Sequence, residues 1–160
     1  MKPESIFELH LKNALSKCSS PSSPKRLHMA MHHAVFPGGA RIRPRLCLAI
    51  ADSFDNYDKN LAIAAAVAIE FLHCASLIHD DLPCFDDANM RRGRPSVHKE
   101  FDERLAILAG DALIVEAFRH LNNCETPHFA RLRLVLNLVT RSVGSVSGII
   151  AGQAWECEKK

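Results

Sequence analysis

Residues 78–87 read Ile-His-Asp-Asp-Leu-Pro-Cys-Phe-Asp-Asp, and Arg91 and Arg92 follow shortly after them. Four carboxylates and two guanidinium groups therefore lie together at the end of an otherwise apolar segment. Closely spaced carboxylates repel one another unless hard cations neutralise them, and Mg²⁺ accepts one or two carboxylates while leaving positions for substrate phosphates. Adjacent arginines bind diphosphate oxygens bidentately. A lone acid or arginine would be ordinary solvated surface, but the combination predicts a diphosphate site bridged by divalent metal.

The spacing within this cluster predicts a break in the helix that leads into it. On a continuous helix, Asp80 would share a face with Asp87 rather than with Asp86. Pro83 removes a backbone donor and disfavours such a helix. We therefore expect the helix to end or kink near Asp81, and a loop to bring Asp86 round to Asp80. Both Asp86 and Asp87 remain open as the second metal ligand.

The remainder of the chain has the apolar periodicity of helices and no alternation typical of strands. Asp58 is a plausible N-cap for the longest of them, and residues 93–98 are expected to form a loop. The fold class is all-α, in one domain that spans residues 1–160. Helices are expected at about 4–17, 24–35, 45–53, 60–80, 102–120 and 127–143, with a final one within 145–153.

A second basic segment, residues 36–44, reads Phe-Pro-Gly-Gly-Ala-Arg-Ile-Arg-Pro. The Pro-Gly-Gly turn breaks a helix and lets the backbone approach another group closely. Arg41 and Arg43 then stand at the start of the next helix, where the backbone N–H groups also favour anions. By itself this is weak evidence, and a plain loop would be the default. Together with Arg91 and Arg92 it suggests a second phosphate site.

Composition narrows the class of protein. The formal net charge of +2 over 160 residues is too small to indicate binding to nucleic acid. None of the six cysteines has C-x-x-C spacing, the start lacks a secretory signal, and no uninterrupted apolar run reaches membrane-spanning length. We therefore expect a cytoplasmic protein with reduced thiols, no transmembrane segment and no nucleic-acid partner.

These motifs resemble those of the trans-polyprenyl diphosphate synthases, which include the farnesyl and geranylgeranyl diphosphate synthases. Asp80-Asp81-x-x-x-x-Asp86 with residues 91–93 is similar to their first aspartate-rich motif. Residues 38–44 resemble their Gly-Gly-Lys-Arg-x-Arg-Pro motif, residues 70–81 their Glu-x-x-His segment, and residues 152–153 their Gly-Gln motif. Four motifs in the family's order make the resemblance specific over nearly the whole chain.

The resemblance implies a prenyltransferase with the helical bundle of the isoprenoid-synthase type, here only its N-terminal helices. By analogy, Mg²⁺ on Asp80 and Asp86 would bridge the diphosphate of an allylic substrate, helped by Arg91. The protein would be a homodimer, or a heterodimer with a synthase subunit. The second substrate, isopentenyl diphosphate, would be held by Arg43, His73 and Arg92.

Product length is expected to depend on Ala75 and Ser76, which precede Asp80 by about one helical turn. In the family, bulky aromatic residues at these positions resemble a floor that stops growth of the prenyl chain. Both residues are small here, which indicates an open channel and a geranylgeranyl-type product. The alternative is that Ala75 only permits close helix packing.

Three departures from the family pattern affect the expected activity. Ala40 stands where the family has Lys, and Glu156 where an Asp usually follows the Gly-Gln motif. The family's second aspartate-rich motif, which lies in its C-terminal half, does not occur in these 160 residues. We therefore expect the chain alone to make no prenyl diphosphate, whether it is a fragment of a synthase or a shortened homologue.

A non-catalytic helical subunit that pairs with and modulates a synthase is the alternative function, and Ala40 favours it. A terpene cyclase is a weaker possibility, because it would need neither the Gly-Gly turn with its arginines nor Arg91 and Arg92.

Overall fold

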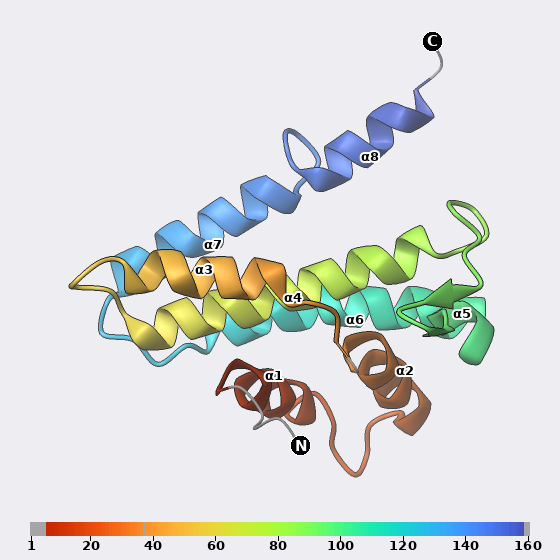
Figure 1. The fold of residues 1–160 in the computed structure, drawn as a ribbon, viewed down its shortest axis with the longest axis horizontal. Coiled ribbons are helices and arrows are strands. Elements are labelled where there is room, and N and C mark those ends of the chain that lie inside the picture. Colours follow the sequence, from red (N-terminus) through yellow and green to blue (C-terminus); the bar gives the residue numbers. More distant parts are fainter. Residues whose placement is uncertain (1–5, 37, 159–160) are drawn as a thin grey trace.

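The computed structural model describes residues 6–36 and 38–158, and these are predominantly helical (Figure 1). This confirms the expected all-α class; the one sheet in the described ranges is a two-stranded hairpin. In chain order the elements are α1 (Ile6–Ser16), α2 (Lys25–Val35), α3 (Ile42–Asp52), α4 (Lys59–Asp80), β1 (Met90–Arg91), β2 (Arg94–Pro95), α5 (Val97–Glu100), α6 (Glu103–Asn122), α7 (Phe129–Val143) and α8 (Ile149–Cys157).

Helix α4 runs through the centre of the bundle and contacts α1, α2, α3 and α6 (Figure 1). Its expected N-cap is confirmed, because the Asp58 carboxylate accepts a hydrogen bond from the Leu61 N–H at 3.0 Å. Many of its buried residues are alanines, which let neighbouring helices approach closely. Phe71 is fully buried in the same core, a burial that stabilises the fold by about 1.5–3 kcal/mol.

The apolar composition of α4 has a further consequence. Glu70 interrupts the run, yet by length and composition alone α4 is long and apolar enough to cross a membrane. Within the structure, 61% of its most apolar 18-residue window is buried. The apolar composition of α4 is therefore explained by its position in the core, where other helices pack around it.

The segment after the aspartate cluster differs from the expected loop. Strands β1 and β2 pair antiparallel through a two-residue turn, in which Arg92 has φ of 53° and Gly93 of 76°. Positive φ at both central residues is the geometry of the tight hairpin turns that match strand twist. The short helix α5 follows at once. Two strands of two residues each are too short to show alternation in a sequence, which is why the sequence analysis missed them.

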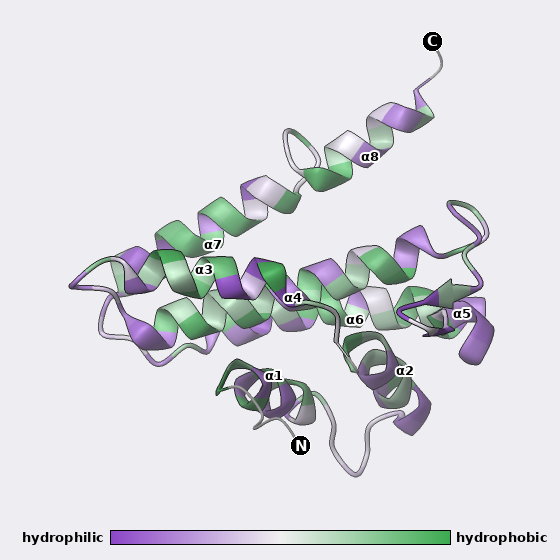
Figure 2. Cartoon of the chain, viewed as in Figure 1, coloured by the Kyte–Doolittle hydropathy of each residue, from purple (hydrophilic) through white to green (hydrophobic). Residues whose placement is uncertain are grey.

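The last two helices are packed differently from α4. Figure 1 shows α7 and α8 extending away from the central helices, and each contains one buried residue, Leu132 in α7 and Ala151 in α8. Several large hydrophobic side chains of α3, α7 and α8 are exposed. Figure 2 shows hydrophobic residues, in green, along these helices. A groove of about 680 Å³ opens between α3, α4 and α7, lined by residues that include Phe54, Leu61 and Leu134.

Candidate diphosphate site

The aspartate cluster lies at the C-terminal end of α4, which stops at Asp80 as expected. The chain then turns back on itself, and the Asp86 N–H donates to the Asp80 carbonyl oxygen at 2.9 Å. A second turn bond joins the Asp87 N–H to the Leu82 carbonyl at 3.1 Å. The loop thus brings Asp86 round to Asp80, which confirms the geometric part of the sequence prediction.

Asp86 and Asp87 have different surroundings. Burial raises the pKa of Asp80, and the neighbouring charge of Asp86 raises it further. Asp87 has a positive φ of 43° and its carboxylate lies 3.4 Å from Lys99 Nζ and 3.8 Å from His98 Nε2. The charge of Asp86 thus acts on Asp80, whereas the carboxylate of Asp87 lies beside Lys99 and His98.

Asp81 is not part of the exposed acidic pair. Its side chain is almost fully buried and accepts hydrogen bonds from Arg91 Nε at 3.0 and 3.1 Å and from Arg91 Nη2. This contact raises the pKa of Arg91, which keeps the guanidinium charged. Arg91 nevertheless leaves 37% of its side chain exposed. The sequence places four carboxylates in one cluster, and nothing in their spacing indicates that Asp81 turns inward.

The acidic pair suits Mg²⁺ only as part of a site. Among the residues that the structure describes, no group of three or more His, Cys, Asp or Glu side chains is arranged to hold a metal ion. Asp80 and Asp86 supply hard carboxylate oxygens, and Mg²⁺ commonly takes one or two carboxylates and completes its shell with phosphate oxygens and water. These two residues fit that requirement.

A basic cluster adjoins the acidic pair. Arg43 Nη1, at the start of α3, lies 3.2 Å from His73 Nε2, which is two helical turns before Asp80 on α4. Burial, and then the charges of Arg43 and Arg92, lower the pKa of His73, so its ring is neutral at neutral pH. The three residues expected to hold isopentenyl diphosphate are therefore brought within electrostatic reach of one another.

Arg92 contains a donor without an assigned acceptor. Its Nη1 is buried and has no hydrogen-bond partner in the described part of the chain. A Cβ placed on Gly39 would lie 3.0 Å from Arg92 Nε, so the backbone of the Gly38–Gly39 segment passes close to this guanidinium. Pro37, the first residue of the expected Pro-Gly-Gly turn, lies outside the described residues. An unpaired charged donor beside closely approaching glycine backbone suits an anion.

Arg41 turns away from this cluster, although the sequence analysis grouped it with Arg43. It is 7% exposed and its guanidinium is held by Glu8 of α1 and Glu70 of α4. Sequence spacing gave no signal of this inward position, because Glu8 lies more than thirty residues away.

The two residues expected to set product length lie in different surroundings. Ala75 is 1% exposed and belongs to the hydrophobic core, while Ser76 is half-buried and its hydroxyl donates to the His73 carbonyl. The alternative interpretation, that Ala75 permits close helix packing, therefore agrees with its position in this chain. Any role in product length stays a prediction, and it now rests mainly on Ser76.

Residues 24–160 match the polyprenyl synthetase family. The chain is a member of that family. It is 47% identical to the geranylgeranyl diphosphate synthase of Cereibacter sphaeroides over 158 residues, which cover 98% of this chain and 54% of that protein. It is also 42% identical to geranylgeranyl pyrophosphate synthase 4 of Arabidopsis thaliana, over 96% of this chain and 41% of that protein.

Solved structures of the same kind confirm the fold. A geranyltransferase from Legionella pneumophila superposes with a TM-score of 0.86 at 37% identity, covering 96% of this chain and 53% of that chain. An FPP/GFPP synthase from Zymomonas mobilis superposes with a TM-score of 0.79 at 38% identity, and the match covers 95% of this chain and 56% of that chain. The chain therefore spans between 41% and 56% of the length of these relatives and solved structures.

Proposed function

We propose that this chain is the N-terminal half of a prenyltransferase that condenses an allylic diphosphate with isopentenyl diphosphate, of the geranylgeranyl diphosphate synthase kind. The observation that carries the proposal is the pairing of two subsites of opposite charge, centred on residues that lie two helical turns apart near the end of α4. One is the acidic pair of Asp80 and Asp86, and the other is the basic cluster around His73. The identity to geranylgeranyl diphosphate synthases supports the choice of reaction.

The acidic subsite would receive the allylic diphosphate. Asp80 and Asp86 would hold Mg²⁺, which stabilises charge on the diphosphate as it leaves. Arg91 would contact the same group through its exposed edge, while Asp81 fixes the guanidinium from behind. Groups fixed in place before the reaction stabilise developing charge most effectively.

The basic subsite would receive isopentenyl diphosphate. Arg92 offers its unpaired buried donor, and Arg43 lies beside the neutral ring of His73. Ala40 is exposed at the edge of this cluster, where the family's Lys would add a further contact. With both substrates held, the allylic C–O bond breaks and its electron pair leaves with the diphosphate. The isopentenyl double bond then forms the new C–C bond, and a proton is lost to the released diphosphate.

A second candidate function is a non-catalytic subunit that pairs with a synthase. The exposed apolar residues of α3, α7 and α8 favour it, because helices of this composition are normally covered. Both candidates predict that the 160 residues alone do not elongate a prenyl chain, since the family's second aspartate-rich motif does not occur in them. They also share the expectation of a homodimer or of a heterodimer with a synthase subunit.

Calorimetry with a non-ionising thio analogue of an allylic diphosphate tests the acidic subsite. We expect binding to the 160-residue chain to require Mg²⁺ and to be lost in Asp80→Asn. Asp87→Asn is the matched control, because Asp87 lies in the same loop but faces His98 and Lys99. Equal binding by the wild type and Asp80→Asn, with or without Mg²⁺, would contradict the proposal.

A further inference from the structure

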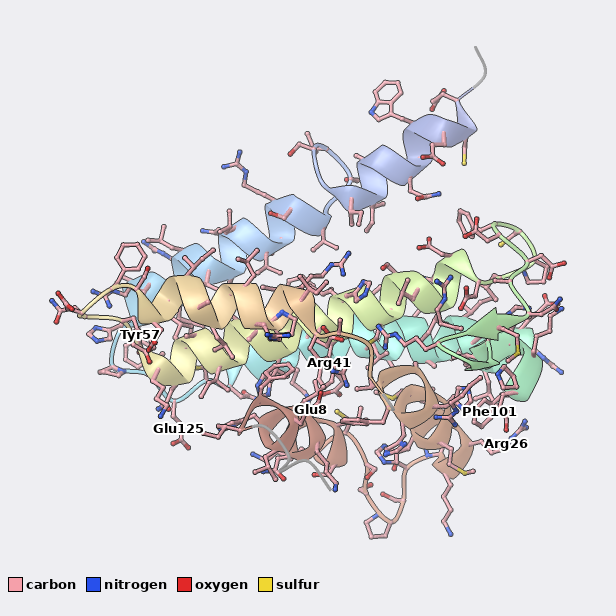
Figure 3. All side chains as sticks on the ribbon, viewed as in Figure 1. Glu8, Arg26, Arg41, Tyr57, Phe101 and Glu125 are labelled. Carbon is pink, nitrogen blue, oxygen red and sulfur yellow. The ribbon has the colours of Figure 1, made fainter. Side chains whose placement is uncertain are left out.

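Three segments that are distant in sequence meet at the guanidinium of Arg41. Its Nε lies 2.8 Å from Glu8 Oε1 of α1, and its Nη1 lies 2.5 Å from Glu70 Oε1 of α4. Its Nη2 donates to the Val35 carbonyl at the end of α2, at 2.9 Å. Figure 3 shows Glu8 and Arg41 pointing toward one another between α1 and the central helices. One buried side chain thus connects α1, α2 and α4.

The backbone at Arg41 is held in an unusual conformation. Arg41 has φ of 51°, in the left-handed region, and it is the residue immediately before α3. Residues other than glycine enter this region only when their surroundings require it. The contacts from Glu8, Glu70 and Val35 supply that requirement, because they hold the side chain inward while the backbone turns into the helix.

The same side chain packs against the Gly38–Gly39 segment. A Cβ on Gly38 would lie 2.1 Å from Arg41 Cζ, so the guanidinium occupies the space of a side chain at that position. On the other side of the turn, Gly39 rests against Arg92. Arg43, two residues after Arg41, then starts the first turn of α3 and reaches His73. Arg92 therefore contacts the Gly38–Gly39 segment, Arg43 follows Arg41 in the chain, and Arg43 in turn contacts His73.

The charge balance around Arg41 also favours a fixed position. Burial alone would lower the pKa of Arg41, but the hydrogen bonds that its guanidinium donates to Glu8 and Glu70 outweigh burial and raise the pKa. A buried guanidinium that keeps its charge must keep its carboxylates, because removing one leaves a buried charge poorly compensated. Loss of Glu8 would therefore be felt at Arg41 rather than only at α1.

We propose that Arg41 is a positioning residue for the isopentenyl diphosphate subsite, and that Glu8 extends this role to α1. The inference rests on the proposed function, because it assigns the basic cluster to that substrate. Arg41 itself does not touch the substrate. It fixes the Gly38–Gly39 segment and the start of α3, so that Arg43 and the unpaired donor of Arg92 face the same ligand.

The test uses Glu8→Gln, which changes a residue outside both subsites. Glu116→Gln is the matched control, because it removes the carboxylate that pairs with the exposed Arg119 on α6. Calorimetry on the 160-residue chain measures the dissociation constant of isopentenyl diphosphate without Mg²⁺. It also measures that of the thio analogue of an allylic diphosphate with Mg²⁺. In Glu8→Gln we expect the dissociation constant for isopentenyl diphosphate to rise about tenfold, the effect of misaligning roughly one charge-assisted contact.

The selectivity of that loss separates positioning from general destabilisation. The Mg²⁺-dependent ligand should bind Glu8→Gln as it binds the wild type, and Glu116→Gln should leave both affinities unchanged. Arg41→Lys keeps the charge but lacks the planar fork, so it should show the same selective loss. Amide NMR signals of Gly38 and Gly39 should shift in Glu8→Gln and Arg41→Lys, and remain in place in Glu116→Gln.

Each failure has a separate meaning. If the wild type binds no isopentenyl diphosphate, the proposed function is overturned and the role of Arg41 with it. If the wild type binds and Glu8→Gln and Arg41→Lys bind equally well, only the role of Arg41 is overturned. Parallel losses of both ligands would also overturn it, because they would show that the whole fold is weakened.

Discussion

Helices α4 and α7 are both rich in apolar residues, yet they are packed very differently. Helix α4 buries residues along its whole length, and Phe71, Cys74 and Ile78 all belong to the core. Helix α7 buries only Leu132, while Leu134 and Leu138 are each 66% exposed. The central helix is covered by its neighbours in this chain, whereas α7 packs through only part of its apolar surface.

The difference agrees with the share of its relatives that the chain spans. The chain spans 54% of the Cereibacter sphaeroides synthase and 53% of the Legionella pneumophila structure, so each of these proteins has a further portion that this chain does not match. The diphosphate site, by contrast, is built on the well-packed part. Asp80, His73 and the hairpin stand on or beside α4, whereas α7 and α8 remain largely uncovered.

The strongest test of this contrast compares Phe71→Ala with Leu138→Ala. Phe71 is fully buried, so its truncation should lower the free energy of unfolding by about 3–5 kcal/mol. Leu138 is largely exposed, and its truncation should change that free energy by less than about 0.5 kcal/mol. Urea denaturation followed by circular dichroism measures both. A cost at Leu138 close to that at Phe71 would show that α7 is packed in solution.

Two neighbours on α4 sharpen the comparison within one helix. Ala75 lies in the core, so Ala75→Phe should overpack it and destabilise the protein by about 1–3 kcal/mol. Ser76 is half-buried, and Ser76→Phe should be tolerated better. Thermal unfolding of the two variants decides the order. In a protein that includes the second half of the family fold, Ser76→Phe should then shorten the product more than Ala75→Phe, as chromatography of dephosphorylated products would show.

The contact of Asp58 with Thr126 joins the start of α4 to the segment before α7. We expect this contact to have a smaller effect on the free energy of unfolding, and the effect to depend on pH. Asp58 caps α4 and also accepts a hydrogen bond from Thr126, just before α7. Asp58→Ala should cost about 1 kcal/mol at neutral pH. Asp102→Ala, at the N-cap of α6, is a control for loss of a cap that lacks the link to α7.

The sign of the pH dependence follows from the direction of the shift. The Thr126 hydroxyl, and then the Leu61 N–H, lower the pKa of Asp58 in the folded state. Its stabilisation is therefore fully present above the ordinary carboxylate pKa and is lost as the pH falls through the lowered value. Unfolding measured from neutral to strongly acidic pH should show a smaller acid loss in Thr126→Val than in the wild type. An identical acid loss would mean that this hydrogen bond contributes nothing.

The smallest expected effect on stability comes from a polar change on the uncovered surface. Leu134→Gln should alter the free energy of unfolding by less than about 0.5 kcal/mol. Binding of a hydrophobic dye should nevertheless fall, because Leu134 lines the groove between α3, α4 and α7. Cys74→Ser, a change inside the core, should not reduce dye binding. Unchanged dye binding in Leu134→Gln would place the accessible apolar surface elsewhere.

Much of the fold could be predicted from the sequence because helical periodicity is a local signal. The Asp58 cap, the end of α4 and the return of Asp86 to Asp80 all depend on residues close together in the chain. The inward turns of Asp81 and Arg41 could not be predicted in this way. Each depends on a partner supplied by another segment, and sequence spacing does not show which charges become buried together.

The contact between Gly38 and Arg41 has a consequence for how such sequences can diverge. A lineage cannot gain a side chain at position 38 while the guanidinium of Arg41 fills that space. If Arg41 were lost first, Glu70 would be left as a buried acid without its arginine. Substitutions at these three positions are therefore expected to arise together, as one inherited unit, in any homologue that abandons the glycine.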